Sequence, residues 1–484
     1  MVAIDVRPVF YVIGNLLIIV AVAMLAPMVV DLAVGNSDWF VFGTASALTL
    51  FFGVLLVLTN WTPAKTLNLR QTFLLTTFAW IVVCTFGALP FIFAETRLDF
   101  TDAYFEAMSG LTTTGATVIV GLDRLAPGLL LWRSLLQWLG GLGIIAMGIA
   151  ILPFLRVGGM QLFRAESSDR SDKVVPRASD LAVALGWIYL GLTIACTVLL
   201  TLSGMPTFDA VNHAMTAVST AGFSTKDASV GHWDSAAVHW VLTVFMVIGA
   251  LPFVRLISLA RGDGRSLWRD SQVRWFLGFL AVISLAMGGW LSQTAEIAWH
   301  DALRLATFNI VSVVTTTGYA STDYGLWGPF AVGVFLILTV IGGCTGSTTG
   351  GIKVFRFEIL FMVMRVQLIR LYSPHRMMPL TYGGKPVDND IMVSVMAFGF
   401  AFVASILITF VILSAIGLDF LTAISGAATA IANVGPGLGP VIGPVGNFSS
   451  LPDSAKWVLS VAMLLGRLEF FTVLVLLNPK FWMR

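Results

Sequence analysis

The feature that most constrains this chain is a series of long apolar segments. The first of them, Val9–Val30, contains no Asp, Glu, Lys or Arg. A helix of about 20 apolar residues is long enough to cross the apolar core of a bilayer, which is about 30 Å thick. Only 11% of the 484 residues are charged, compared with about 25% in soluble domains. We therefore expect an all-α protein that crosses the bilayer many times.

Further apolar segments predict nine more helices. Val9–Val30 is too long for the core of a signal peptide, and no small-residue cleavage site stands out, so we expect it to be retained. The other helix candidates start near Asp38, Gln71, Gly128, Asp180, Asp234, Val273, Tyr324, Ile391 and Asp453. The segment from Tyr324 is interrupted by a polar glycine run and resumes at Ile352. The total of ten is even, which is consistent with both termini on one side.

Positive charge alternates between the loops. The basic loops contain Lys65 and Arg70; Arg156, Arg164, Arg170, Lys173 and Arg177; Arg261, Arg265, Arg269 and Arg274; Arg356, Arg365, Arg370, Arg376 and Lys385; and Lys480 and Arg484. The loops between them have fewer Lys and Arg residues. The positive-inside rule therefore places the basic loops and both termini in the cytoplasm.

On the outer side, four short helices precede the return crossing. They are FTDAYFEAMSGL from Phe100, TFDAVNHAMTAV from Thr207, HDALRLATFNIVSVV from His300 and DFLTAISGAATAIA from Asp419. At 1.5 Å per residue, about 12–15 residues span about 18–22 Å, which reaches the middle of the bilayer but does not cross it. Each short helix leads to a glycine, namely Gly115, Gly222, Gly318 or Gly435.

The spacing of these glycines predicts an internal repeat. We expect an N-terminal helix pair over 1–68, followed by pore repeats over 69–157, 178–262, 272–372 and 389–484. The residues nine positions before the glycines are Glu106, His213, Asn309 and Gly426. Because three of them are polar at the same depth, we expect hydrogen bonds that brace the short helices.

The sequences around the glycines are LTTTGAT, STAGFST, VVTTTGYAST and ANVGPGL. Non-helical backbone at membrane depth persists only when it is buried in protein or lines a water-filled path. Glycine permits backbone conformations that other residues avoid, so successive carbonyls can point towards one axis. Rings of carbonyl oxygens replace the hydration shell of an alkali cation. The other interpretation is that each Thr-Gly pair is an ordinary turn that ends a helix.

Several longer motifs connect this pattern to a known family. They are QWLGGLGIIAMGIAILPFLRVGGMQLFRAE from Gln137, FNIVSVVTTTGYAST from Phe308, GGCTGSTTGGIKVFR from Gly342 and LGRLEFFTVLVLLNPKFW from Leu465. The chain resembles the Trk/Ktr/HKT superfamily of potassium transporters, most closely its bacterial TrkH branch, over essentially its whole length. The resemblance implies four pseudo-repeats of helix, pore helix, filter loop and helix around a central pore, plus the two N-terminal helices.

The resemblance also implies which residues form the filter, with K+ as the transported ion and no organic cofactor in this chain. The implied carbonyl donors are Thr113, Thr114 and Gly115; Thr220, Ala221 and Gly222; Thr316, Thr317 and Gly318; and Asn433, Val434 and Gly435. The fourth set departs most from the potassium-channel TVGYG, so we expect only approximate fourfold symmetry and a modest potassium preference. The four glycines favour potassium over sodium.

The stretch IGGCTGSTTGGIK, from Ile341 to Lys353, interrupts a helix of the third repeat. It is not a P-loop, because Ile352 separates the last glycine from the lysine and the flanks are membrane helices. A packing kink is one interpretation. The resemblance instead implies an intramembrane gate made of Gly342, Gly343, Gly346, Ser347, Thr348, Thr349, Gly350 and Gly351. We expect Lys353 to help hold its closed state.

Arg467 and Glu469 lie inside the last crossing helix. Ionisable residues at such depth are costly, so we expect each to have a partner or a function. One interpretation is a structural ion pair, with each other or with a neighbouring helix. The other, which the resemblance favours, is that Arg467 faces the permeation path as a barrier to cations.

The resemblance implies partners as well. A cytosolic nucleotide-binding subunit of the Rossmann type would dock on the loops Arg156–Arg177 and Tyr372–Lys385, and the protein would form a homodimer in the bacterial inner membrane. The positive-inside rule alone also explains these basic loops. No nucleic-acid partner is indicated.

Two other function classes compete with a channel-like transporter. A symporter coupled to protons or sodium would need carboxylates within the membrane, where Glu106 and Glu469 are the main candidates. An enzyme is not supported, because His213, His232, His239, His300 and His375 are scattered and no nucleophile–base pair is visible. Cys84, Cys196 and Cys344 lie in or beside apolar segments, and we expect them to be small buried hydrophobic residues.

Overall fold

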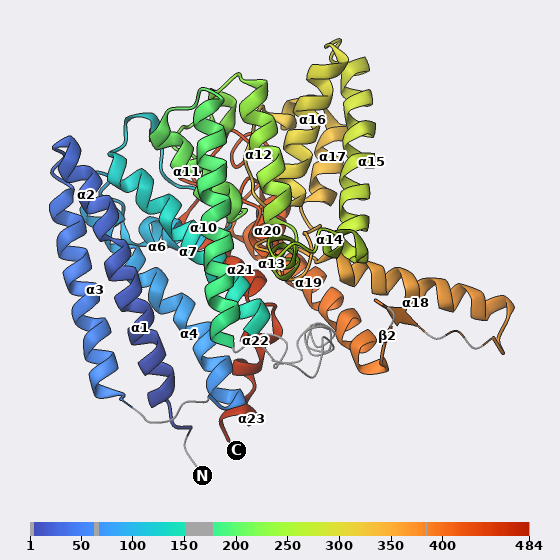
Figure 1. Cartoon of the computed structure of the whole chain (residues 1–484), viewed down its shortest axis with the longest axis horizontal. Helices are drawn as coiled ribbons and strands as arrows, with labels where there is room; N and C mark the ends of the chain where they lie inside the picture. The colour runs from blue at the N-terminus through green and yellow to red at the C-terminus, as the bar shows by residue number, and fades with distance from the viewer. Residues whose placement is uncertain are drawn as a thin grey trace.

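The structure is a computed structural model that describes residues 4–61, 67–150, 178–376, 378, 380–383 and 385–483. It is a bundle of helices, most of whose long axes are roughly aligned, with short helices packed in the centre (Figure 1). Seven helices in the described residues are long and apolar enough to cross a membrane, or nine if each of two bent pairs counts as one crossing. The prediction of a multi-pass helical protein is confirmed.

Two N-terminal crossings lie at one edge of the bundle. They are formed by α1 (Arg7–Ala23), α2 (Leu25–Val34) and α3 (Trp39–Thr59). α1 and α3 pack closely, because a Cβ on Gly14 would lie 2.8 Å from the carbonyl oxygen of Gly53. Small residues allow such close approach of membrane helices. The side chain of Asp31 joins this pair to the rest, since it accepts a hydrogen bond from the Gly128 N–H at 2.7 Å.

Four successive units then share an order of long helix, short helix, loop and helix. The first contains α4 (Leu69–Gly87), α5 (Leu89–Phe93), α6 (Phe100–Leu111), η1 (Leu122–Arg124) and α7 (Pro127–Ala150). The second contains α10 (Ala178–Leu202), α11 (Thr207–Val218), η2 (Ser229–His232), α12 (Ala236–Gly249), α13 (Phe253–Ala260) and α14 (Arg265–Arg269).

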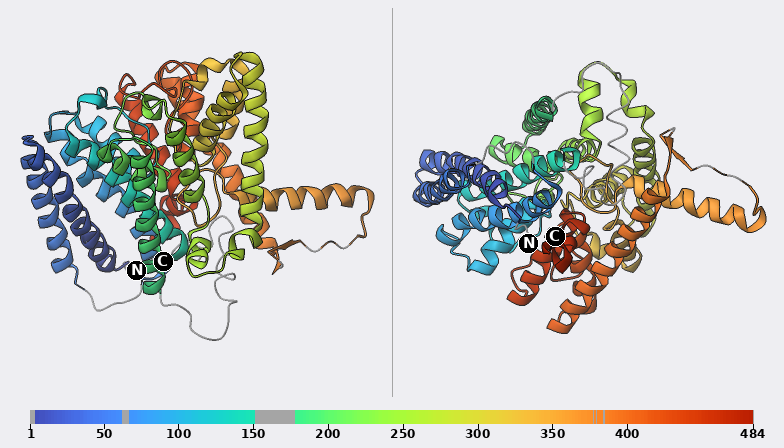
Figure 2. Two further views of the ribbon diagram at one scale, coloured as in Figure 1. Left: turned by 45° about the horizontal axis from the view of Figure 1, so that its top comes forward. Right: turned by 90° about the horizontal axis from the view of Figure 1, so that it is seen from below.

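The third unit carries an additional arm. It contains α15 (Ser271–Thr294), α16 (Trp299–Val314), η3 (Tyr324–Trp327), α17 (Pro329–Leu338) and α18 (Val354–Tyr372), followed by the antiparallel pair β1 (Thr381–Tyr382) and β2 (Lys385–Pro386). The fourth contains α19 (Asn389–Ile416), α20 (Phe420–Ala432), α21 (Asp453–Arg467), α22 (Phe471–Leu474), η4 (Val475–Leu477) and α23 (Pro479–Trp482). α18 extends sideways from the bundle in both views of Figure 2.

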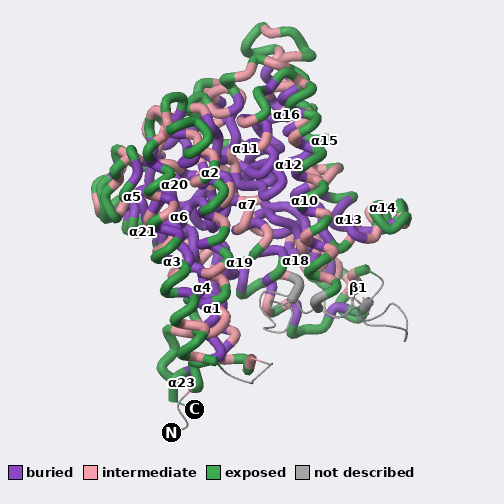
Figure 3. The backbone as a smooth tube through the Cα atoms, turned by 60° about the vertical axis from the view of Figure 1, so that its left-hand side comes forward, coloured by how far each residue is buried: buried purple, intermediate pink, exposed green. Residues whose placement is uncertain are grey.

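The short helices α6, α11, α16 and α20 lie in the buried centre. Figure 3 shows the buried backbone concentrated around α7, α11 and α12, whereas the helices at the edge are largely exposed. Each short helix packs against its own unit, and α6 also packs against α21 at the far end of the chain. The first and last units therefore lie side by side, which closes the arrangement. Cys84, Cys196 and Cys344 are buried and free, as predicted.

Sharp bends break the crossings in the second and fourth units, so Glu469 lies at a break and not inside the last crossing helix as expected. The α12–α13 pair bends by 104° at its break, and the pair formed by Asp453–Arg467 and Phe471–Leu477 bends by 105°. Pro252 lies at the first break, where it removes a backbone donor. Glu469 and Phe470 form the second break with φ of +61° and +48°. The interruption between α17 and α18, which the glycine run predicted, is confirmed.

Candidate functional site

The loops after the four short helices repeat one backbone conformation. Thr113, Thr220, Thr316 and Asn433 have φ values of +55°, +49°, +55° and +55°. Two residues later, Gly115, Gly222, Gly318 and Gly435 have φ values of +86°, +77°, +84° and +112°. This left-handed region suits Gly and Asn but is rare for β-branched Thr. Three threonines in register in a rare conformation indicate a constrained site.

Hydrogen bonds fix the exit of each loop from its helix. The N–H groups of Thr114, Ala221, Thr317 and Val434 donate to the carbonyls five residues earlier, at 2.9, 2.9, 2.8 and 3.0 Å. Those acceptors are Ser109, Thr216, Ser312 and Thr429. These loop N–H groups are therefore bound to their own helices, and in all four units the chain leaves the short helix in the same way.

The four loops meet in a closed cycle, which we call the ring. A Cβ on Gly115 would lie 2.3 Å from the Ala221 oxygen, and one on Gly222 would lie 1.8 Å from the Thr317 oxygen. A Cβ on Gly318 would lie 2.0 Å from the Val434 oxygen, and one on Gly435 would lie 2.8 Å from the Thr114 oxygen. Each glycine thus touches the carbonyl of the next unit, and the fourth touches the first. The predicted filter residues, 113–115, 220–222, 316–318 and 433–435, are brought together around one axis.

Polar residues of the short helices brace the chain just after the ring. Glu106 accepts hydrogen bonds from the Thr117 hydroxyl at 3.0 Å and from the Val118 N–H at 2.9 Å. His213 Nε2 lies 3.0 Å from Ser224 Oγ, and Asn309 Nδ2 donates to Ser321 Oγ at 2.9 Å. The predicted bracing is confirmed for these three. In the fourth unit the neighbouring residue performs this role, because Ser425 Oγ accepts from the Leu438 N–H at 2.9 Å.

Two residues of α7 also hold the ring, and the sequence analysis did not single them out. Arg133, which is 1% exposed, pairs with Glu106 at 2.8 Å and donates to the Ser224 carbonyl at 2.8 Å. Gln137 donates to the Ala221 carbonyl at 2.6 Å and accepts from the Phe223 N–H at 2.9 Å. An arginine and a glutamine inside a crossing helix were the available signal. One lone pair of the Ala221 carbonyl is therefore already bound by the protein.

The stretch 342–351, which we call the interrupting loop, lies against one side of the ring. The Gly350 N–H donates to Thr316 Oγ1 at 2.8 Å, and the Gly351 N–H donates to the Ala432 carbonyl at 2.9 Å. The hydroxyls of Thr220 and Thr348 are 2.9 Å apart. The loop thus contacts the left-handed positions, or their immediate neighbours, of the second, third and fourth units.

The helix breaks supply further partners to the interrupting loop. The carbonyl of Gly249 accepts from the hydroxyl of Thr348 at 2.9 Å, and that of Ala250 accepts from the Cys344 N–H at 2.9 Å. Arg467 Nη1 donates to the Thr348 carbonyl at 2.9 Å. The bends therefore place two backbone carbonyls and the Arg467 guanidinium within hydrogen-bond distance of the interrupting loop. The breaks in α12–α13 and α21–α22 surround the break between α17 and α18.

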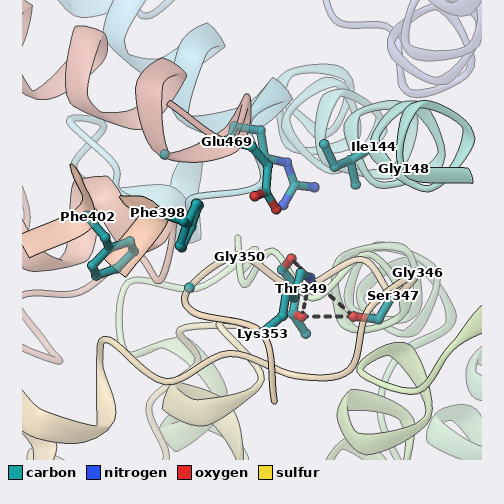
Figure 4. Close-up of a pocket in the computed structure, with 13 residues that line it drawn as sticks. Ile144, Gly148, Gly346, Ser347, Thr349, Gly350, Lys353, Phe398, Phe402 and Glu469 are labelled. Carbon is teal, nitrogen blue, oxygen red and sulfur yellow. Dashed lines mark hydrogen bonds between the residues drawn. The ribbon is translucent and has the colours of Figure 1, made fainter. Parts of the chain in front are cut away.

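Four ionisable side chains are buried beside the interrupting loop. Lys353 donates to the carbonyl and to the hydroxyl of Thr349, the latter at 2.8 Å (Figure 4). Glu469 pairs with Arg356 of α18, which supports the ion pair with a neighbouring helix and not the pair between Arg467 and Glu469. A cavity of about 30 Å³ is lined by Lys353, Arg467 and Glu469 together with Phe398 and Phe402, which is enough space for at least one water molecule.

A second cavity, of about 60 Å³, lies on the opposite side of the ring. Its lining includes Gly115, Gly222, Gly318 and Lys226. Lys226 lies 3.5 Å from Asp123, while Asp227 accepts from the Gly121 and Leu122 N–H groups at 3.0 Å each. The ring therefore separates two cavities. One cavity borders the interrupting loop, and the other lies beside charged residues of both signs, Asp123, Lys226 and Asp227.

Comparison with known proteins identifies the family. The family model for TrkH, described as a cation transport protein, matches residues 40–483. The chain belongs to the TrkH family. It is 46% identical over 476 residues to the Trk system potassium uptake protein TrkI of Halomonas elongata, covering 98% of this chain and 96% of that one. It is 38% identical over 484 residues to Trk system potassium uptake protein TrkH of Escherichia coli K12, covering 98% and 99%.

A solved structure agrees with this family assignment. The crystal structure of the potassium transporter TrkH from Vibrio parahaemolyticus matches with a TM-score of 0.91 at 38% identity, covering 98% of this chain and 99% of that one. The resemblance inferred from the sequence is thus confirmed. As a TrkH-family member the chain is a transport protein and not an enzyme. Of the two docking loops predicted, Arg156–Arg177 lies outside the described residues.

Proposed function

We propose that this TrkH-family chain takes up potassium through a filter of backbone carbonyls. The observation that carries the proposal is the closed cycle in which each ring glycine touches a carbonyl of the next unit. Four loops at one level offer oxygens around an axis, as a filter that replaces the hydration shell of K+ requires. The carbonyl ends of α6, α11, α16 and α20 point to the same place, and their dipoles favour a cation. The curated relatives are named as potassium uptake proteins.

The filter oxygens are assigned to residues 113–115, 220–222, 316–318 and 433–435. Carbonyl groups are preferred over side chains because a ring of threonine hydroxyls would be incomplete in the second and fourth units, where Ala221 and Val434 occur. The Gln137 amide on the Ala221 carbonyl supports only approximate fourfold symmetry. We expect potassium to pass faster than sodium.

The interrupting loop is assigned as the gate. Its contacts with Thr220, Thr316 and Ala432 support a closed state, because the loop then occupies the space next to the ring. Arg467 and Lys353 add two buried positive charges at that point, whereas Glu469 is already paired with Arg356. A cation leaving the ring would meet this unfavourable field. Displacement of the loop removes both the obstruction and the Arg467 contact.

The rival mechanism, a symporter, has little support in the contacts of its two candidate carboxylates. Glu106 is engaged by Arg133, Thr117 and Val118, and Glu469 is engaged by Arg356. A proton relay would need at least one of them to exchange protons with the path. Both are instead held in ion pairs.

Ion flux into liposomes that contain the purified protein tests the proposal. Potassium or sodium gradients are imposed at clamped voltage, with and without gradients of the other ion and of protons. Potassium flux down its own gradient that ignores the other gradients is the expected result. Flux that occurs only with a sodium or proton gradient would establish a symporter instead. If no ion moves, the assay is repeated with the cytosolic partner and nucleotide.

We further propose a cytosolic nucleotide-binding regulatory subunit of the Rossmann type, a homodimer, and residence in the bacterial inner membrane with both termini in the cytoplasm. α18 projects from the bundle, and the β1–β2 pair, which lies in and just after the described part of Tyr372–Lys385, lies beside its first turns (Figure 1). This position suits a docking surface. Crosslinking from cysteines introduced along 380–383 tests it, because a docked subunit would be captured there and not at the opposite end of the bundle.

A further inference from the structure

A large open groove lies where the two ends of the chain meet, far from the ring. It has a volume of about 720 Å³ and is formed by the start of α4 and the C-terminal elements η4 and α23. Its lining includes Arg70, Phe73, Val475, Lys480, Phe481 and Met483. Ligand pockets commonly enclose about 300–1,000 Å³, so the groove is large enough for an amphipathic molecule.

Two positively charged side chains, Arg70 and Lys480, line the groove. Among the described residues neither Arg70 nor Lys480 has an ion-pair partner within 4.0 Å, and no carboxylate lines the groove. The nearby carboxylate of Asp5 is bound by Arg7 at 2.9 Å, and the hydrogen bonds from Arg7 hold the pKa of Asp5 below its usual value. The positive end of α4, a 19-residue helix, points to the same place. The groove therefore favours an anion.

The rest of the lining is apolar. Phe73 and Phe481 form the floor, with ring centroids 6.3 Å apart, and they are 8% and 9% exposed. Leu69 and Met483 are 57% and 64% exposed, so they extend the apolar surface to the rim. Arg70 lies over the Phe481 ring at 5.9 Å, which places a cation at the junction of the polar and apolar parts. A free phosphate would use the cations but not this surface.

The location matches the edge of a bilayer. The crossing Leu69–Phe93 begins at the groove, and Trp482 beside it is 51% exposed. Tryptophan is enriched where the apolar core meets the headgroups. Basic pockets between crossing helices at this level bind anionic lipid headgroups.

We propose that this groove binds one anionic phospholipid. Arg70 and Lys480 contact the phosphate, and an acyl chain lies along Phe73, Val475 and Phe481. The lipid joins the first repeat to the end of the chain, since α4 and α23 both contribute residues to the groove. This proposal does not depend on which ion is transported.

Native mass spectrometry of the full-length protein tests it. Phosphatidylglycerol or phosphatidylcholine is titrated into detergent-purified protein, and a third series uses inorganic phosphate. We compare the wild type with the double variant Arg70→Gln/Lys480→Gln. The matched control is Arg261→Gln/Arg265→Gln, which removes the same charge from exposed positions beside α13 and at the start of α14. With about 1 kcal/mol for each basic residue near an anionic headgroup, the double variant is expected to bind phosphatidylglycerol about tenfold or more weakly.

The outcomes are distinct. Weaker phosphatidylglycerol binding in the double variant alone, with little phosphatidylcholine binding in any protein, supports the site. Equal binding by the double variant and the control overturns it. Inorganic phosphate that displaces phosphatidylglycerol at similar concentrations would identify a phosphate site and also overturn the lipid proposal. The single variant Phe481→Leu keeps the charges, and it is expected to weaken lipid binding without changing phosphate binding.

Discussion

Two kinds of irregular backbone meet at the centre of this molecule. The ring and the interrupting loop are both rich in glycine and threonine, and both are buried. The ring loops are braced mainly by side chains of their own short helices, such as Glu106, His213 and Asn309. The interrupting loop obtains many of its partners from the helix ends of other units, including Gly249, Ala432 and Arg467.

This difference in anchoring explains how two loops of similar composition can differ in how easily they move. A loop held by its own helix moves only if that helix moves. A loop held by neighbouring units can leave as a piece, provided that water or ions replace its partners. Buried polar groups without partners cost about 1–3 kcal/mol each, so several such contacts stabilise the position that the interrupting loop has in this structure. We expect substitutions in the ring to abolish flux and substitutions at the loop to increase it.

The largest effect is expected from Gly222→Ala. The added methyl group would lie 1.8 Å from the Thr317 carbonyl, and the residue has a φ of +77°. Ring geometry cannot survive this overlap, so potassium flux in liposomes should fall below detection. Gly333→Ala in α17 is the matched control, because no atom outside its own helix lies within 4 Å of its added methyl group. Normal flux through the Gly222→Ala protein would mean that ring packing is not required.

The next effect is on stability. Glu106→Gln keeps the size of the side chain but leaves Arg133 buried without its counter-ion, which typically costs about 3–5 kcal/mol. We expect a clear fall in the thermal unfolding midpoint in detergent. Arg7→Ala provides the comparison, because the Asp5–Arg7 pair is 44% and 64% exposed and exposed pairs contribute little to stability. If both variants unfold at the wild-type temperature, the pair does not brace the ring.

Arg467→Ala tests the charge beside the interrupting loop. Arg467 is 2% exposed and donates to the Thr348 carbonyl. A hydrogen bond from a charged group contributes about 1.5–3 kcal/mol, so potassium flux is expected to rise about tenfold or more as the closed state weakens. The elution volume in size-exclusion chromatography should not change. Equal uptake at equal membrane abundance would reject a role for Arg467 in permeation or gating.

A smaller increase is expected from Thr348→Val. This variant keeps the shape of the side chain but removes the hydroxyl that contacts Gly249 and Thr220. A neutral hydrogen bond contributes about 1 kcal/mol, which predicts about fivefold faster potassium flux. Thr59→Val at the end of α3 removes a hydroxyl that bonds only to its own helix and to the adjacent Asn60, and its flux should stay at the wild-type level. A decrease in Thr348→Val flux would contradict the assignment of the loop as a gate.

Sequence reasoning located the short helices almost to the residue. The predicted stretches from Phe100 and Thr207 coincide with α6 (Phe100–Leu111) and α11 (Thr207–Val218), and the other two differ by one residue at their starts. Local signals explain this accuracy. Asp99 and Asp419 accept hydrogen bonds from the first turns of α6 and α20, and a glycine lies three or four residues after each helix end.

The sequence by itself therefore determined the membrane class, the order of the elements, the family and the positions that form the ring. Each of these properties depends on composition or on residues that are close together in the sequence, at most about the length of one crossing helix apart. The tertiary structure decided the rest. The bends of 104° and 105°, the Arg133 and Gln137 contacts with the second unit, and the pairing of Glu469 with Arg356 all join residues distant in the chain. Such contacts form only when packing brings buried polar groups close enough to hydrogen-bond with one another. The sequence around each residue does not indicate which distant residue will lie next to it.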